Sequence, residues 1–164
     1  MVTSRPGAGT KFEIYFPAAD IRAAAETALP LTEPPLGRGE RILYVDDEAS
    51  LLALSKHILE GCGYRVTCFT DPVDGLRAFH ATPDEFDAVL TDFAMPYVSG
   101  LELTESILRI RSAIPVILMS GHLRPEDERT AQRLGVREIL RKPSSVSEMV
   151  YALGRLFGRP AKND

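Results

Sequence analysis

From residue 41 onward, five short runs with strand character alternate with five helical patterns, and this alternation leaves few folds open. The runs are residues 42–45, 64–69, 88–90, 115–119 and 137–141, and the helical patterns cover 49–60, 71–80, 99–111, 125–134 and 145–157. Strands that alternate with helices form a parallel sheet with helices on both faces. A region of about 120 residues with this pattern predicts a flavodoxin-like, doubly wound α/β fold with strand order 2-1-3-4-5.

The helical patterns differ in the apolar surface that they offer. The stripes expected to face the core are Leu51, Leu54, Ile58 and Leu59 in the first pattern, and Val146, Val150, Leu153, Leu156 and Phe157 in the last. The pattern over 125–134 has few apolar anchors beyond Ala131 and Leu134. We therefore expect that helix to be loosely held.

Composition and charge narrow the functional classes. The 164-residue chain has a net charge of -4, which gives no electrostatic case for binding nucleic acid or a membrane surface. No apolar run approaches the roughly 18 residues of a membrane span, and the residues after Met1 are unlike a signal peptide. Cys62 and Cys68 match no metal-binding spacing. These features predict a cytoplasmic location with reduced, buried thiols.

Polar side chains of the types used in catalysis and metal binding follow four of the five runs, at the point where each strand should end. Asp46 and Asp47 follow the first run, Asp92 the third, Ser120 the fourth and Lys142 the fifth. Because the carboxyl ends of parallel strands meet at one edge of the sheet, where such folds bind their ligands, these side chains should converge. Taken alone, Asp92 could also be only the cap of the next helix.

The combination of residue types favours phosphoryl transfer to a carboxylate. Three crowded carboxylates repel one another, and a hard divalent cation such as Mg²⁺ relieves that repulsion through oxygen ligands. Lys142 and Ser120 would then bind the phosphoryl oxygens. A carboxylate that attacks phosphorus forms an acyl phosphate, which is an established covalent intermediate.

Residues 41–157 resemble the receiver domain of two-component response regulators. The matching motifs are Asp46-Asp47, Asp92, Met95-Pro96, Gly100, Ser120-Gly121 and Lys142-Pro143. The resemblance implies that Asp92 is the phosphoryl acceptor and that Ser120 and Lys142 bind the phosphoryl group. It also implies a Mg²⁺ ion held by Asp92, directly by Asp47 and the carbonyl of Ala94, and through water by Asp46.

The residue three positions before the lysine departs from the family pattern. Receiver domains usually carry Tyr or Phe three residues before the lysine, where the ring switches between inward and outward positions, and here the residue is Ile139. Output by that route is therefore in question. Our hypothesis is that the helix over 125–134 signals instead by a change in its own order.

The beginning of the chain has a pattern of its own. Phe12, Ile14 and Phe16 alternate with polar residues, which predicts a half-buried strand. The pattern S-R-P-G-x-G-T-x-F-x-I-x-F-P over residues 4–17 resembles the closing strand of the ATP-binding domain of sensor histidine kinases. The expected division is 1–17 as the end of a kinase domain, 18–40 as a linker, 41–157 as the receiver and 158–164 as a tail.

The order of kinase end and receiver resembles a hybrid sensor histidine kinase. The expected partners are the phosphotransfer helices of a histidine kinase or a histidine phosphotransfer protein, with acetyl phosphate as a small donor and a dimer allowed. The chain would phosphorylate and dephosphorylate itself, while the catalytic boxes of a kinase are absent from it. Two alternatives stay open: a docking module that works without phosphate, and a Mg²⁺-dependent phosphatase of the haloacid-dehalogenase type. The phosphatase needs a second Asp where Ala94 stands.

Overall fold

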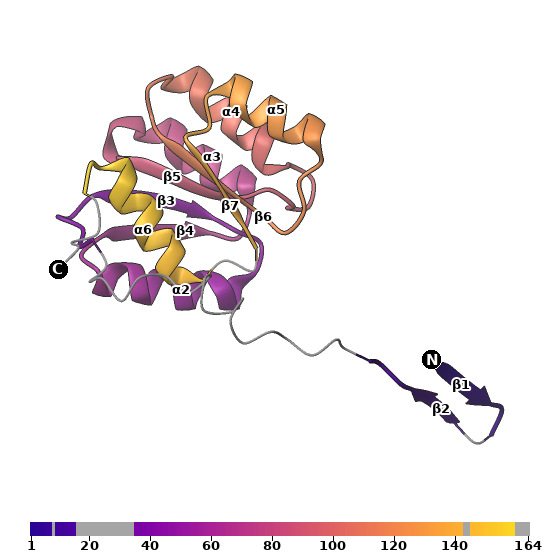
Figure 1. Ribbon diagram of the computed structural model, residues 1–164. Coiled ribbons are helices and arrows are strands. Elements are labelled where there is room, and N and C mark those ends of the chain that lie inside the picture. Colours follow the sequence, from indigo (N-terminus) through magenta and orange to yellow (C-terminus); the bar gives the residue numbers. More distant parts are fainter. Residues whose placement is uncertain (8, 16–34, 143–144, 160–164) are drawn as a thin grey trace. The chain divides into compact units, whose positions relative to one another are not determined.

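The chain divides into two compact units, Met1–Leu31 and Thr32–Asp164. The computed structural model describes residues 1–7, 9–15, 35–142 and 145–159 (Figure 1). Most of the predicted linker, 18–34, and of the tail, 160–164, lies outside those residues. Within the described parts, no helix combines the length and the apolar character needed to cross a membrane.

The first unit contains an antiparallel hairpin of two strands, β1 (Val2–Arg5) and β2 (Gly9–Phe12). The hydroxyls of Ser4 and Thr10 share a hydrogen bond of 2.8 Å across it. The prediction of one half-buried strand through Phe12 and Ile14 is wrong, because β2 ends at Phe12 and these side chains are 68% and 72% exposed. The hairpin has no apolar layer to cover it within its described residues, and Phe16 lies outside them.

The second unit is built on a parallel sheet of five strands in the order β4-β3-β5-β6-β7, which confirms the predicted 2-1-3-4-5 topology. The strands are β3 (Arg41–Val45), β4 (Arg65–Phe69), β5 (Ala88–Asp92), β6 (Val116–Ser120) and β7 (Glu138–Arg141). The helices are α2 (Ala49–Gly61), α3 (Pro72–Ala81), α4 (Gly100–Ile110), α5 (Pro125–Leu134) and α6 (Val146–Leu156), with a 3-10 turn η1 (Pro83–Glu85).

The helices cover both faces of the sheet, α2 and α6 on one side and α3, α4 and α5 on the other (Figure 1). One core cluster packs Leu59 of α2 and Leu153 of α6 against the strands. The other packs Phe79 of α3 and Ile107 of α4 against the opposite face. Both faces of the central strand β5 are therefore buried, as its continuous apolar run requires.

The buried stripe of α2 differs from the predicted one. The structure buries Leu52, Ser55 and Leu59, while Leu54 and Ile58 are 55% and 36% exposed. A polar serine stands in the middle of the true stripe, so apolar periodicity alone selected the neighbouring face. In α6 the prediction is confirmed: Val150 and Leu153 are buried, and Val146, Leu156 and Phe157 pack against the same core.

Candidate functional site

The parallel register brings four of the predicted polar side chains to the carboxyl edge of the sheet. Asp92 is the last residue of β5 and lies opposite Met119 of β6. Asp46 follows β3, and its amide still donates to the carbonyl of Phe69 at 3.2 Å. Ser120 ends β6, and the amide of Lys142 donates to its carbonyl at 2.7 Å.

Lys142 is the centre of this arrangement. Its Nζ lies 2.7 Å from Asp92 Oδ1 and 3.0 Å from Asp46 Oδ2. The two carboxylates are almost fully buried, with 6% and 1% of their side-chain surface exposed, against 26% for Lys142. Buried carboxylates need a counter-charge, because leaving one unpaired costs several kcal/mol, roughly 3–5. The ammonium of Lys142 supplies that charge to both.

The protonation state of Lys142 follows from two opposing effects. Burial disfavours the ammonium form, but the hydrogen bonds to Asp92 and Asp46 and the attraction of their charges outweigh it, so the pKa of Lys142 lies above its ordinary value. The side chain is therefore a cation at neutral pH. A fixed cation beside a carboxylate can stabilise negative charge that is brought to that carboxylate.

Backbone amides hold the two carboxylates in place. The amide of Ala94 donates to Asp92 Oδ2 at 2.9 Å, and the amide of Glu48 donates to Asp46 Oδ1 at 3.0 Å. Each carboxylate thus has a main-chain donor on one oxygen and Lys142 on the other. These amides were not predicted, and no side-chain signal could reveal them, because any residue but proline supplies an amide.

The loop after Asp92 turns tightly back to α4. A Cβ atom on Gly100 would lie 2.1 Å from the carbonyl oxygen of Asp92, so only glycine fits there. Ser99 caps α4 in a reciprocal capping box with Glu102. In the loop between Asp92 and Ser99, Tyr97 has a φ of 67°, and the amide of Val98 donates to the carbonyl of Pro96 at 2.8 Å. This three-residue turn is a rare and strained conformation for a non-glycine residue.

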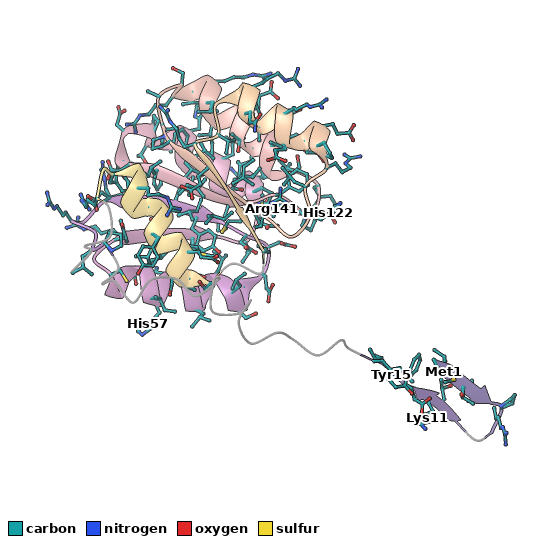
Figure 2. All side chains as sticks on the ribbon, viewed as in Figure 1. Met1, Lys11, Tyr15, His57, His122 and Arg141 are labelled. Atoms are coloured by element: carbon teal, nitrogen blue, oxygen red, sulfur yellow. The ribbon has the colours of Figure 1, made fainter. Side chains whose placement is uncertain are left out.

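The remaining predicted site residues differ in burial, and Ser120 is only 3% exposed. The hydroxyl of Ser120 donates to the carbonyl of His122 at 3.0 Å, while Asp47 and Ala94 are exposed. Figure 2 shows His122 and Arg141, the last residue of β7, at the same edge of the sheet, where Ser120 and Arg141 are partners in register. Ile139, in the position of the family aromatic, is half-buried.

The residues fit a hard cation in chemistry but are not assembled around one. Asp46, Asp47, Asp92 and the carbonyl of Ala94 would offer only oxygen ligands, which suit Mg²⁺. Among the described residues, however, no three acidic, histidine or cysteine side chains lie close enough together to hold a metal ion. Lys142 instead neutralises Asp46 and Asp92 directly.

Comparisons with known proteins agree with this geometry. Over 155 residues, 93% of its length, the chain is 28% identical to the sensor protein EvgS of Escherichia coli, of which it spans 13%. It is 31% identical to a receiver domain protein of Clostridium thermocellum, with a TM-score of 0.69 over 73% of this chain and 94% of that one.

A third relative carries a metal. The receiver domain of a sensor histidine kinase from Pseudomonas aeruginosa is 26% identical, with a TM-score of 0.65 over 73% of this chain and 98% of that one, and its structure has a magnesium ion coordinated in the active site cleft. The sequence model of the response regulator receiver domain matches residues 42–154. The chain therefore belongs to the response regulator receiver domain family of two-component systems.

Proposed function

We propose that this domain accepts a phosphoryl group on Asp92 from a phosphohistidine, as a regulatory switch or relay in a phosphorelay. The observation that carries the proposal is the acceptor itself: Asp92 is 4% exposed, with the ammonium of Lys142 at 2.7 Å and the amide of Ala94 at 2.9 Å. These two donors orient the carboxylate and lie where the incoming negative charge would arrive.

The reaction balances as a transfer between two nucleophiles. One carboxylate oxygen of Asp92 attacks phosphorus, the P–N bond to the donor histidine breaks, and the departing imidazole keeps the bonding electron pair. The product is an acyl phosphate. Lys142 would move from its pairing with the carboxylates to a phosphoryl oxygen. The hydroxyl of Ser120 would give up its hydrogen bond to the His122 carbonyl and donate to a second phosphoryl oxygen.

Mg²⁺ fits this proposal as the second source of positive charge. Asp46, Asp47, Asp92 and the carbonyl of Ala94 would hold it, and bound there it would neutralise the crowded carboxylates and the phosphoryl oxygens. The magnesium ion in the Pseudomonas aeruginosa receiver supports the assignment. Because Asp47 is exposed, it can turn towards the other acids without disturbing the core.

The wider context that we propose is a hybrid sensor histidine kinase in the cytoplasm. The match to EvgS, a sensor protein, extends over 93% of this chain and so reaches beyond the receiver domain itself. Residues 1–17 would close the kinase ATP-binding domain, 18–40 would link it to the receiver, and 158–164 would form a tail. The donor would be the phosphotransfer helices of a histidine kinase or a histidine phosphotransfer protein.

The test is the intact mass of the chain after incubation with Mg²⁺ and acetyl phosphate. We expect one added phosphoryl group, absent without Mg²⁺ and absent in Asp92→Asn. The matched control is Asp74→Asn, which removes an exposed carboxylate on α3 that pairs only locally with Arg77, and it should be phosphorylated as the unmodified chain is. An adduct that survives Asp92→Asn would overturn the assignment.

A docking module that works without phosphate is the second candidate, and Ile139 is the observation that favours it. An aliphatic side chain at that position has no ring to swing between two positions. The absence of any adduct in the experiment above would support this candidate. The phosphatase alternative gains no support, because Ala94 offers no carboxyl group as a general acid.

A further inference from the structure

Residues 35–40, which precede β3 and which the sequence placed in a linker, lie against the receiver core; we call them the strap. The amide of Gly37 donates to the carbonyl of Cys62 at 2.7 Å, and the amide of Gly39 donates to that of Gly63 at 2.8 Å. The amide of Arg65 in turn donates to the carbonyl of Glu40 at 2.8 Å. The strap is thus hydrogen-bonded along the turn between α2 and β4.

The packing of the strap leaves no room for side chains at its closest contacts. A Cβ atom on Gly37 would lie 2.8 Å from the backbone of Gly63, and one on Gly63 would lie 2.7 Å from the backbone of Gly37. Pro35 is buried, and a Cβ atom on Gly154 of α6 would lie 2.1 Å from its ring. The glycines therefore serve close approach of backbones.

Arg159, just after α6, holds the strap in place from the carboxyl-terminal end of the domain's sequence. Its guanidinium donates to the carboxylate of Glu40, and Nη1 donates to the carbonyl of Leu36 at 3.1 Å. The guanidinium also lies over the ring of Phe157, 5.9 Å from its centre. The side chains of Arg159 and Glu40 are only 20% and 14% exposed, so water screens this ion pair less than a surface pair.

The strap and Arg159 lie outside the part of the chain that matches the family model. The family match covers residues 42–154, which excludes both the strap and Arg159. The strap also lies at a particular place: Glu40 comes just before β3 and Arg65 begins β4, whereas Asp92 ends β5. In a parallel sheet these are opposite edges, so the strap attaches the preceding chain to the edge away from the acceptor.

We propose that the strap docks in cis on the receiver and that Arg159 locks it, so that the tether to the preceding part of the protein leaves from a fixed point at the amino edge of the sheet. The point where the tether attaches then lies away from the acceptor edge. Opening the lock frees six residues, which lengthens the tether by up to about 20 Å when extended. A longer tether changes the effective concentration at which the receiver meets an attached partner.

The test compares Arg159→Ala with Arg155→Ala by amide hydrogen exchange on the full chain. Arg155 is the matched control, because it lies in the last turn of α6 and also pairs with a glutamate, Glu138; within the part of the chain that the structure describes, its side chain makes no hydrogen bond to the strap. In Arg159→Ala we expect the amides of Gly37 and Gly39 to exchange about tenfold faster, because a charge-assisted hydrogen bond is lost. In Arg155→Ala their exchange should match that of the unmodified chain.

An independent readout is trypsin cleavage after Arg38, which is exposed. Cleavage there should accelerate in Arg159→Ala and stay unchanged in Arg155→Ala.

In the hydrogen-exchange experiment, the amides of Ile42–Val45 in the centre of the sheet serve as the internal reference. Unchanged exchange at Gly37 and Gly39, or equal acceleration at Ile42–Val45, would overturn the proposal, since neither outcome is that of a separately locked strap.

Discussion

The last two helices of the receiver have similar lengths but different means of support. Helix α6 (Val146–Leu156) buries five residues: Met149, Val150, Ala152, Leu153 and Gly154. Helix α5 (Pro125–Leu134) buries only Ala131. Apolar burial contributes roughly 25 cal/mol for each Å² removed from water, so the two helices differ greatly in what tertiary packing gives them.

Helix α5 is instead supported by ion pairs in its first turn and by a glycine that closes its carboxyl end. Arg124 pairs with Glu126 and Asp127 in the first turn, and Gly135 closes the helix in the left-handed conformation. Acidic groups at a helix amino terminus are favourable, but exposed ion pairs each contribute only about 0–1 kcal/mol. Helix α5 can therefore open locally, whereas α6 should open only with the domain.

The largest expected effect separates the two helices by packing. Leu153→Ala in α6 should destabilise the domain by about 2–5 kcal/mol, because it leaves a cavity in a fully buried core. Leu134→Ala in α5, at a half-buried position, should cost about 1 kcal/mol. Urea unfolding measures both. Equal costs would refute the contrast between the helices.

Amide hydrogen exchange sharpens the same comparison. We expect the amides of α5 to be at least about tenfold less protected than those of α6, because α5 opens locally. After incubation with Mg²⁺ and acetyl phosphate, protection within α5 should change more than protection within α6. Equal protection of α5 with and without phosphoryl donor would count against the hypothesis that this helix signals through its own order.

The amino-terminal caps of α5 and α6 should give a smaller difference in stability. The hydroxyl of Ser145 accepts from the amide of Glu148 at the start of α6, whereas Arg124 makes no side-chain cap bond at the start of α5. Ser145→Ala should cost about 1 kcal/mol of stability. Arg124→Ala should stay within about 0.5 kcal/mol. Thermal unfolding of the two variants checks this order, and the reverse order would contradict it.

The smallest effect concerns the lock beyond α6. The hydrogen bond from Arg159 holds the pKa of Glu40 below its ordinary value of 4.5. Because the folded pKa is the lower one, the stabilisation is fully present above pH 4.5 and is lost as the pH falls through the folded pKa. Melting temperatures of the unmodified chain and Glu40→Gln should therefore converge in acid. A difference that stays constant with pH would exclude this role of Glu40.

The sheet could be predicted well because the central strands are short apolar runs and the strands alternate regularly with helical patterns. The prediction failed where a rule of local pattern was broken. Ser55 in the buried stripe of α2 diverted the prediction to Leu54 and Ile58, and the glycines of the strap looked like a linker because close backbone contact leaves no signal in a single sequence.

In the candidate site, too, part of the arrangement could be predicted from the sequence and part could not. Topology alone brings Asp46, Asp92, Ser120 and Lys142 to one edge, so residue types and strand ends were enough to assemble them. The direct pairing of Lys142 with both carboxylates was not predicted, because the sequence assigned the acids to a cation and Lys142 to the phosphoryl group. Only the distances between side chains could show that one ammonium serves both acids.

The bond between Lys142 and Asp46 spans 96 residues of the chain. During synthesis at about 5–20 residues per second, Asp46 is therefore made roughly 5 to 20 seconds before its counter-charge. Until β7 is in place, Asp46 and Asp92 lack the ammonium that neutralises them when they are buried. Completion of the last strand is thus a condition for closing this edge of the sheet, and a nascent or truncated chain without it should have no working acceptor.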